Sequence, residues 1–224
     1  MQVINFEGLE QLEFRGTEAY NSLRTNIQFC GSDIKTICFT SCTPNEGKSI
    51  VSFRLATSIA ESGKKVLFID ADLRKSVLIG RLRIDKGIVG LTHYLSGMKE
   101  LNEVVYSSNI DNLDIIFAGP VPPNPSELLS SNSFVKLIES MKEKYDYVII
   151  DTPPLGLVID SANVAKYCDG TIIVIESNNV SHKFVTKIVK QLGAGNCRIL
   201  GAILNKVPQK NKSYYGGYYG EYSS

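Results

Sequence analysis

The sequence lacks several features that would define whole classes of protein. No stretch of about 18 uncharged apolar residues occurs in the 224 residues, so we expect no membrane-spanning helix and no direct membrane insertion. Lysine and arginine number 24 against 23 for aspartate and glutamate, which gives no reason to expect nucleic-acid binding. The five cysteines form no C-x-x-C pair, which indicates reduced thiols and argues against a metal cluster. The N-terminal segment contains acids and no apolar core, so it does not resemble a signal peptide. We therefore expect a cytoplasmic protein.

The sequence does contain a regular alternation of short apolar strands and longer helical patterns. Runs such as 148–150 and 172–175 have no polar residue at alternate positions, as expected of parallel strands covered on both faces. We expect strands at 35–40, 65–69, 113–117, 147–150, 171–175 and 198–204, and helices at 17–29, 48–61, 90–105 (broken at Gly97), 126–143, 160–167 and 181–192. This order predicts an α/β fold with a doubly wound, mainly parallel sheet and helices on both faces.

A change of composition near the C-terminus predicts a domain at 1–207 and a flexible tail at 208–224. Five of the eleven tyrosines lie within nine residues of the glycine-interleaved tail: Tyr214, Tyr215, Tyr218, Tyr219 and Tyr222. The tail has no apolar periodicity, so it is not expected to form a helix or strand of its own. Clustered phenols on flexible backbone favour a kinase substrate, and the alternative is an aromatic segment that binds a partner.

The segment SCTPNEGKSI (41–50) is predicted to be a phosphate-binding loop. It follows an apolar strand and opens a helix, so backbone N–H groups and the helix N-terminus can face an anion. The expected nucleotide-binding residues are Pro44, Asn45, Glu46, Gly47, Lys48, Ser49 and Ile50. Lys48 would reach the β- and γ-phosphates and Ser49 would offer its hydroxyl to Mg²⁺. Cys42 replaces the first glycine of the usual pattern, and Asn45 can supply the positive φ. A structural turn is the alternative.

Two further motifs supply carboxylates at predicted strand ends. In VIIDTPP, Asp151 follows an apolar strand and can hold Mg²⁺ directly or through water, although an aspartate in this place is often only a turn former. In VLFIDADLRK, Asp70 and Asp72 would point the same way on extended backbone. Their repulsion needs a cation, which Mg²⁺, Arg74 or Lys75 can supply. A solvated acidic turn is the alternative for this second motif.

The motifs PNEGKS, LFIDADLR and VIIDTPP, the stretch GPVPPNPSELL and the tyrosine-rich C-terminus resemble the bacterial tyrosine kinases of capsule and exopolysaccharide synthesis. The resemblance covers almost the whole chain. Within that family, the chain resembles the type in which the kinase is a separate cytosolic protein. That family shares its P-loop NTPase fold with the MinD and ParA ATPases. The resemblance implies ATP-dependent autophosphorylation of the tail tyrosines, mainly between subunits, in the regulation of polysaccharide synthesis and export.

For the site, the resemblance implies phosphoryl transfer from ATP with Mg²⁺. The expected metal ligands come from all three motifs: Ser49, Asp72 and Asp151. Lys48 and the loop would hold the phosphates. Asp70 is the expected base for the incoming phenol, although Asp70 and Asp72 could exchange roles. Arg74 would steady the acidic pair or the transferring phosphoryl group, and Asn205 is expected near the adenine.

The resemblance also implies partners. The family assembles into a ring, an octamer in some members, through an E-x-x-R-x-x-R motif. Here the motif reads Glu18, Asn21 and Arg24, so the middle arginine is missing and the stability of the ring is in question. A transmembrane activator of the polysaccharide co-polymerase type would recruit the chain to the inner face of the cell membrane, and a phosphotyrosine phosphatase would reverse the modification.

Three other classes share part of the pattern. A MinD- or ParA-like ATPase, acting as a positioning or assembly switch, would share the fold and the nucleotide site. Its signature lysine is replaced by Thr43, however, and no amphipathic helix can be drawn through 214–224. A GTPase is suggested by Asn205 and Lys206, but Pro208 stands where guanine recognition needs an aspartate. A non-enzymatic adaptor would require the carboxylates to be decoys. Labelled ATP with anti-phosphotyrosine blotting separates these classes.

Overall fold

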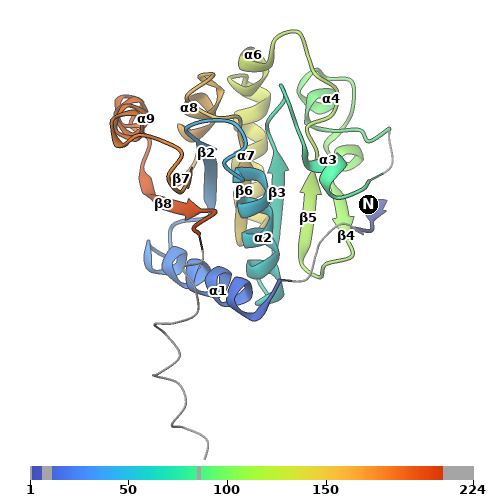
Figure 1. Ribbon diagram of the computed structural model, residues 1–224. Coiled ribbons are helices and arrows are strands. Elements are labelled where there is room, and N and C mark those ends of the chain that lie inside the picture. The colour runs from blue at the N-terminus through green and yellow to red at the C-terminus, as the bar shows by residue number, and fades with distance from the viewer. Residues whose placement is uncertain (1, 7–11, 85–86, 209–224) are drawn as a thin grey trace, which may run out of the picture.

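The computed structural model describes residues 2–6, 12–84 and 87–208 as one mixed sheet with helices on both faces (Figure 1). The strands are β1 (Gln2–Ile4), β2 (Thr36–Ser41), β3 (Val66–Asp70), β4 (Tyr106–Ser108), β5 (Leu113–Ile116), β6 (Tyr147–Asp151), β7 (Gly170–Glu176) and β8 (Ile199–Asn205). The helices are α1 (Phe14–Phe29), α2 (Lys48–Glu61), α3 (Leu78–Arg81), α4 (Leu91–Leu95), α5 (Leu101–Val104), α6 (Pro125–Leu129), α7 (Asn132–Lys144), α8 (Asp160–Ala165) and α9 (His182–Ala194).

The sheet places the three predicted motifs on neighbouring strands. The strand order is β1-β4-β5-β3-β6-β2-β7-β8, and every neighbouring pair is parallel except β4 with β5. Strands β3, β6 and β2, which lead into the three motifs, are therefore adjacent and end at the same edge of the sheet. The doubly wound, mainly parallel α/β fold predicted from the sequence is confirmed.

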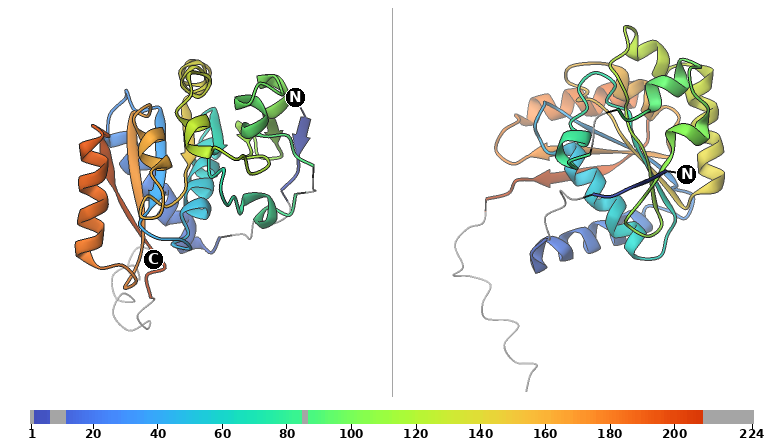
Figure 2. Two further views of the ribbon diagram at one scale, coloured as in Figure 1. Left: turned by 90° about the horizontal axis from the view of Figure 1, so that it is seen from above. Right: turned by 90° about the vertical axis from the view of Figure 1, so that its right-hand side faces the viewer.

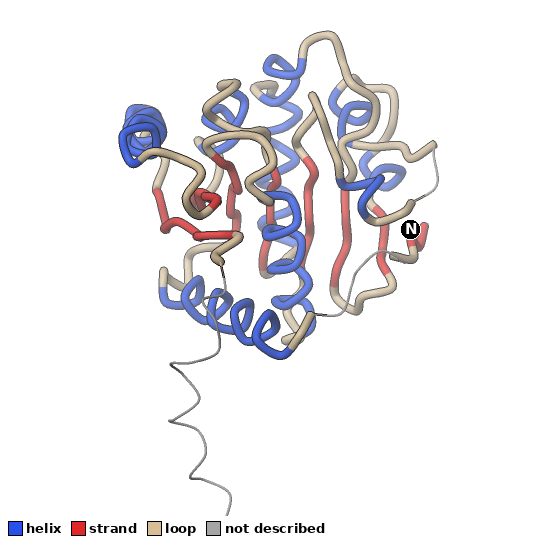
Figure 3. The backbone as a smooth tube through the Cα atoms, in the orientation of Figure 1, coloured by secondary structure: helices blue, strands red, loops and turns tan. Residues whose placement is uncertain are grey.

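Both faces of the central strands are buried, which explains why their sequences show no polar alternation. Along β6, Ile149 packs in one hydrophobic layer with residues of α1 and α2, whereas Val148 and Ile150 pack in the other with residues of α7 to α9. Figure 1 shows α2 in front of the sheet and α7 behind it, and Figure 3 shows the helices on either side of the strands. A strand buried on both faces needs apolar side chains at every position.

The predicted helix at 126–143 is wrong as a single element, because the structure divides it into α6 and α7. Ser131 is the N-cap of α7, and its hydroxyl accepts a bond from the Phe134 N–H at 3.3 Å. Serine side chains compete with the helix for backbone partners, so the pair Ser130-Ser131 ends one helix and begins the next. The predicted break at Gly97, which has φ 70°, is confirmed between α4 and α5.

Three short elements were not predicted: β1, α3 and β4. Each has only three or four residues, too few to show a period of 2 or 3.6. Strand β4 pairs on one side with β1 and on the other with β5. None of the helices among the described residues has the length and apolar character needed to cross a membrane.

We expect Asp169 to make a pH-dependent contribution to the stability of the sheet. Its Oδ2 accepts the N–H groups of Lys35 at 3.0 Å and Thr36 at 2.9 Å, and Lys142 forms an ion pair with Oδ1. Burial alone would raise the pKa of this carboxyl, but the bonds from Lys142, Thr36 and Lys35 outweigh burial and lower the pKa. The stabilisation is therefore present above the ordinary pKa of aspartate and is lost as the pH falls through the lowered value.

Asp169→Asn is accordingly expected to lower the free energy of unfolding by about 2 kcal/mol at neutral pH, since bonds to a charged group are lost. The deficit should shrink below about pH 4, where the wild-type carboxylate also becomes protonated. Urea unfolding at pH 7 and in acid measures both effects. Asp33→Asn is the control, because Asp33 is 73% exposed and its ion pair with Arg198 should contribute little. An equal deficit at both pH values would contradict this account.

Candidate functional site

The loop between β2 and α2 has the backbone geometry of a phosphate-binding loop. Asn45 has φ 65° and Gly47 has φ 88°, so the predicted positive φ at Asn45 is confirmed. Gly47 is the N-cap of α2, and no side chain caps this end of the helix. The first N–H groups of a helix have no partner within it, so they can face an anion. A Cβ at Gly47 would lie 2.2 Å from the Asn205 Nδ2, and the positive φ would strain any other residue, so the position favours glycine.

The buried side chain of Glu46 holds the loop in place by accepting two backbone hydrogen bonds. Its side chain is buried at 1% exposure, and its Oε2 accepts the Thr43 N–H at 2.8 Å while Oε1 accepts the Glu176 N–H at 3.3 Å. The Glu46 carbonyl accepts Nδ2 of Asn205 at 2.8 Å. Asn205, expected near the adenine, therefore lies against the loop, where it fixes the backbone that precedes Gly47.

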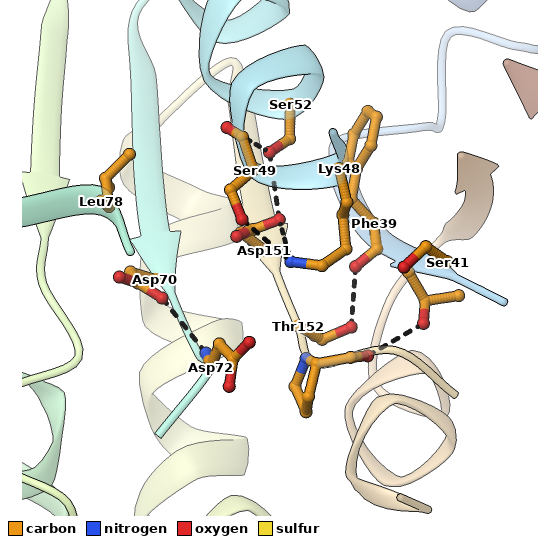
Figure 4. Close-up of polar contacts among 12 residues, drawn as sticks. Phe39, Ser41, Lys48, Ser49, Ser52, Asp70, Asp72, Leu78, Asp151 and Thr152 are labelled. Atoms are coloured by element: carbon orange, nitrogen blue, oxygen red, sulfur yellow. Dashed lines mark hydrogen bonds and ion pairs between the residues drawn. The ribbon is translucent and has the colours of Figure 1, made fainter. Parts of the chain in front are cut away.

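Lys48 and Asp151 form a buried ion pair at the centre of the site. The Lys48 Nζ lies 2.7 Å from the Asp151 Oδ1, and the exposed fractions of the two side chains are 6% and 2%. Ser52 also donates to Asp151 Oδ1, at 3.1 Å, and the Lys48 ammonium donates to the Ser49 hydroxyl at 3.1 Å. Figure 4 shows these four side chains converging from α2 and the end of β6. Ser52 lies one turn beyond Ser49 and was not predicted as a site residue.

Three carboxylates lie together where β3 and β6 end. Asp70 and Asp151 are register partners on these strands, and Asp72 follows two residues later. Burial, then the charge of Asp151, raises the pKa of Asp70 to about 7. Burial also raises the pKa of Asp72, against the lowering effect of the Lys48 charge. Crowded, buried carboxylates of this kind favour a bound cation or a proton.

Asp70 and Asp72 do not occupy equivalent positions. Strand β3 ends at Asp70, and the Asp72 N–H folds back to donate to Asp70 Oδ1 at 3.2 Å (Figure 4). The extended backbone that would point both carboxylates the same way therefore stops before Asp72. The second oxygen of Asp70 accepts a bond from the Ser76 hydroxyl. Asp72, held by the Lys75 N–H at 3.0 Å, lines the cleft beside the phosphate loop.

Arg74 is held by partners that the sequence did not reveal. Its guanidinium makes a two-pronged contact with Asp160, with Nε at 2.7 Å from Oδ2 and Nη2 at 3.1 Å from Oδ1. Ser126 accepts a bond from Nη2 at 2.9 Å and donates to Asp160 Oδ1 at 2.6 Å. Arg74 thus lies at the edge of the cleft, bound to α6 and α8, and makes no ion pair with Asp70 or Asp72 among the described residues.

The residues of the cleft fit a nucleotide with Mg²⁺. Besides the phosphate loop, the cleft is lined by Asp72, Arg74, Lys75, Val77, Arg81 and the segment that follows β6: Pro153, Pro154, Leu157 and Val158. Within the described ranges, no group of three or more His, Cys, Asp or Glu side chains is arranged to hold a metal ion. Mg²⁺ in phosphoryl-transfer sites usually takes one or two carboxylates together with phosphate oxygens and water. The hydroxyl of Ser49 and the carboxylates of Asp72 and Asp151 match that donor set.

The predicted assembly residues lie on α1. Glu18 is exposed and accepts a bond from the Asn21 side chain at 3.0 Å. Arg24 is half-buried and donates to the Ser58 carbonyl of α2 at 2.7 Å, so within one subunit it already joins α1 to α2. The predicted phosphorylation sites Tyr214, Tyr215, Tyr218, Tyr219 and Tyr222 lie outside the described residues.

Together, the mainly parallel sheet, the loop after β2 that ends in the N-cap glycine of α2 and the carboxylate at the end of β6 define a P-loop NTPase. The sequence matches the family described as "AAA domain" over residues 34–198. It is 43% identical over 205 residues to the tyrosine-protein kinase CpsD of Streptococcus agalactiae, covering 92% of this chain and 89% of that protein.

Solved structures show the same relationship. The kinase domain of the Escherichia coli tyrosine kinase ETK superposes with a TM-score of 0.82 and 38% identity, covering 90% of this chain and 80% of that one. The septum site-determining protein MinD of Pyrococcus horikoshii, complexed with Mg-ADP, superposes with a TM-score of 0.67 and 26% identity, covering 80% and 72%. The chain belongs to the family of bacterial tyrosine-protein kinases, and its enzyme class is that of the protein-tyrosine kinases.

Proposed function

We propose that this chain is an ATP-dependent tyrosine autokinase that phosphorylates its own C-terminal tyrosines, mainly in a neighbouring subunit, and so regulates capsular or exopolysaccharide synthesis and export. The observation that carries the proposal is one site in which buried Lys48 faces Asp151 and Asp72 beside a glycine-capped helix N-terminus. The same chain carries five tyrosines in its last eleven residues. A phosphoryl donor site and a group of acceptors therefore belong to one polypeptide.

The side chains of the site divide the work of phosphoryl transfer. The N–H groups at the start of α2 and the Lys48 ammonium hold the phosphates of ATP. With Asp70 as the base, Ser49, Asp72 and Asp151 would hold Mg²⁺, which would neutralise the charge that develops on the phosphate oxygens. To meet the phosphates, the Lys48 ammonium exchanges part of its contact with Asp151, now 2.7 Å away, for phosphate oxygens. Arg74 stands at the cleft edge, where its charge can steady the transferring group.

The position of the two acidic residues after β3 bears on the choice of base. Asp72 lines the cleft, whereas Asp70 is buried behind it and bonded to Ser76. This geometry supports Asp72 as the acid that faces the incoming phenol, with Asp70 accepting the Asp72 N–H from behind. In that arrangement Ser49 and Asp151 remain as the metal ligands. A loose transition state asks little of the base, so positioning of the phenol is the larger part of its role.

We also propose partners for this chain, on the basis of its membership of the family. A transmembrane activator of the polysaccharide co-polymerase type would recruit the chain to the inner face of the membrane, and a phosphotyrosine phosphatase would reset the tail. Subunits would assemble into a ring through Glu18 and Arg24 of α1. Because Arg24 is bound to Ser58 within the subunit, a weak ring is expected unless this contact is exchanged for one with a neighbour.

The test mixes two forms of the chain. A tagged Lys48→Met chain is incubated with wild-type chain, ATP, Mg²⁺ and the activator's cytosolic segment, and label on the tagged chain is measured. We expect phosphotyrosine on the inactive chain, and loss of more than about 90% of it when the five tail tyrosines become phenylalanine. Tyr167→Phe, at a 38% exposed tyrosine outside the tail, is the matched control. ATP hydrolysis without any phosphotyrosine would instead favour the MinD-like switch.

A further inference from the structure

Helix α9 presents a row of lysines at the surface. Lys183, Lys187 and Lys190 are spaced by four and three residues, so they lie along one face, and all three are exposed. The helix has no acidic residue, and among the described residues none of these lysines forms an ion pair. We call this surface the lysine face. Its positive charge is not neutralised by an ion pair within the part of the chain that the structure describes.

The lysine face lines a shallow hollow at the surface. The hollow is lined by Ser181, His182, Lys183, Phe184, Thr186, Lys187 and Lys190. Phe184 is only partly buried, and its ring packs toward the Gly156 backbone of the segment after β6. Phosphate oxygens in the hollow can contact the ammonium groups, and the phenol ring that carries them can lie on the methylene stems of the lysines. That combination suits a phosphorylated phenol.

The described chain ends close to the start of this helix. The Ser177 N–H donates to the Asn205 carbonyl at 2.9 Å, and Lys206 pairs with Glu176 at 3.1 Å, so the end of β8 is fixed beside the end of β7. Only three residues separate Ser177 from Ser181, the N-cap of α9, and the four steps between them span at most about 14 Å of extended chain. Figure 2 (left) shows the end of β8 and the start of α9 at the same edge of the molecule.

The tail is long enough to reach the whole lysine face. Tyr214 is six residues beyond Pro208, which allows about 20 Å of extended chain, and Tyr222 lies farther still. Helix α9 has 13 residues and is itself about 20 Å long. No other subunit is needed for a tail tyrosine to contact Lys183, Lys187 or Lys190.

We infer that the lysine face binds the phosphorylated tail of its own subunit, an inference that rests on the proposed phosphorylation of that tail. Before phosphorylation, residues 209–224 carry two lysines and one glutamate, a side-chain charge of +1, which the lysine face repels. Each phosphotyrosine adds about −1.5 to −2 charges at neutral pH, so a single modification reverses the sign. Capture on α9 keeps a modified tail away from the acidic site of a neighbouring subunit, and the ring loses the contact that the tail supplied.

The test uses a synthetic peptide of residues 212–224 with phosphotyrosine at its five tyrosine positions, and an unmodified copy. Each is titrated into the full, phosphatase-treated chain without ATP, and binding is followed by fluorescence anisotropy. We expect the phosphopeptide to bind at least tenfold more tightly than the unmodified peptide, and to weaken as salt is raised. The combined variant Lys183→Gln, Lys187→Gln and Lys190→Gln should lose at least tenfold of that affinity.

The matched control removes three exposed lysines elsewhere: Lys64→Gln, Lys136→Gln and Lys144→Gln. Equal phosphopeptide affinity for the two triple variants would overturn the inference, because the attraction would then follow net charge alone. Vesicles of phosphatidylcholine with phosphatidylserine form the second arm. If the α9 variant lost vesicle binding but kept the phosphopeptide, the lysine face would be a membrane contact and the inference would be wrong.

The peptide assay needs no kinase activity, so it separates this inference from the proposed function. A chain that never labels its tail would end the proposed function even if the synthetic phosphopeptide bound to α9. In the intact autophosphorylated chain, a phosphotyrosine phosphatase should remove phosphate several-fold faster from the α9 variant than from the control variant. Equal rates would count against capture of the tail.

Discussion

Lys48→Met is expected to lower tyrosine phosphorylation by at least about 10³-fold, because removal of one preorganised charge contact to the transferring phosphates costs about 4 kcal/mol. The ammonium is buried at 6% exposure, so no water-exposed cation can move easily into its place. Ser49 and the helix N-terminus remain, and they can still hold the nucleotide weakly. The rate of tyrosine phosphorylation should therefore fall by a larger factor than the affinity for ATP.

The structure also predicts that Lys48→Met lowers the stability of the fold, an effect that the sequence did not suggest. Lys48 is the partner of Asp151, whose side chain is 2% exposed, so the methionine variant leaves a buried carboxylate without its cation. Breaking a buried pair on one side destabilises a protein by about 3–5 kcal/mol. Adding Asp151→Asn removes the unpaired charge, and the amide oxygen can still accept the Ser52 hydroxyl that donates to Asp151. The double variant is expected to regain most of the stability and none of the activity.

Three measurements test the predicted losses of activity and stability: urea unfolding, circular dichroism and phosphotyrosine formation with labelled ATP. Lys64→Met, at an exposed lysine outside the cleft, is the control and should change neither stability nor rate appreciably. A folded Lys48→Met chain that labels its tail at the wild-type rate would show that the nucleotide site lies elsewhere. Recovered activity in the double variant would show that Lys48 acts only on stability.

The sequence predicted the parts of this site that depend on local pattern. An apolar run that ends in Asp151, and another that ends in Asp70, place carboxylates at the ends of parallel strands wherever those strands lie in the sheet. The helix that begins after Gly47 has its N-terminus at the same edge because β2 runs parallel to β6. Strand direction therefore predicted that the three motifs share one edge of the sheet, whereas their closeness also depends on β3, β6 and β2 being neighbours, which the sequence did not predict.

Contacts between distant residues could not be predicted in this way. Arg74 bonds to Asp160, 86 positions away, and nothing near Asp160 distinguishes it from an ordinary first-turn helix acid. The sequence indicates only that Glu46 lies in a loop, but in the structure its carboxylate points inward and accepts the Glu176 N–H. The inequality of Asp70 and Asp72 depends on the point at which β3 ends, which a pattern of alternating faces does not specify. The first two misses concern contacts between residues far apart in the sequence, and the third concerns the exact end of a strand; tertiary packing decides all three.

The ion pair between exposed Arg74 and buried Asp160 leads to the second large effect. Asp160 is fully buried, and burial would raise its pKa, but the bonds from Arg74 and Ser126 outweigh burial and lower it. The carboxylate is therefore charged at neutral pH and holds the guanidinium by two bonds at the edge of the cleft. Loss of this hold lets a long, 39% exposed side chain take up other rotamers.

Asp160→Asn is expected to lower the turnover rate of tyrosine phosphorylation by about tenfold to 100-fold and to destabilise the fold by about 2–3 kcal/mol. The amide keeps the size of the side chain but gives up the charge on which the two-pronged contact depends. Ser126→Ala should have a smaller effect in the same direction, because Asp160 still holds Nε of Arg74 in that variant. The KM for ATP should change less than the rate, since Lys48 and the loop still hold the phosphates.

A double-mutant cycle separates positioning from general loss of structure. If Asp160 acts through Arg74, then Arg74→Ala lowers the rate as much as Asp160→Asn, and the double variant is no slower than the worse single variant. Asp114→Asn is the matched control, because Asp114 also holds one polar partner, Tyr145, at 2.7 Å, but lies on β5 outside the cleft. Additive losses of rate in the double variant, or an equal loss of rate in Asp114→Asn, would show that Asp160 serves only the stability of the fold.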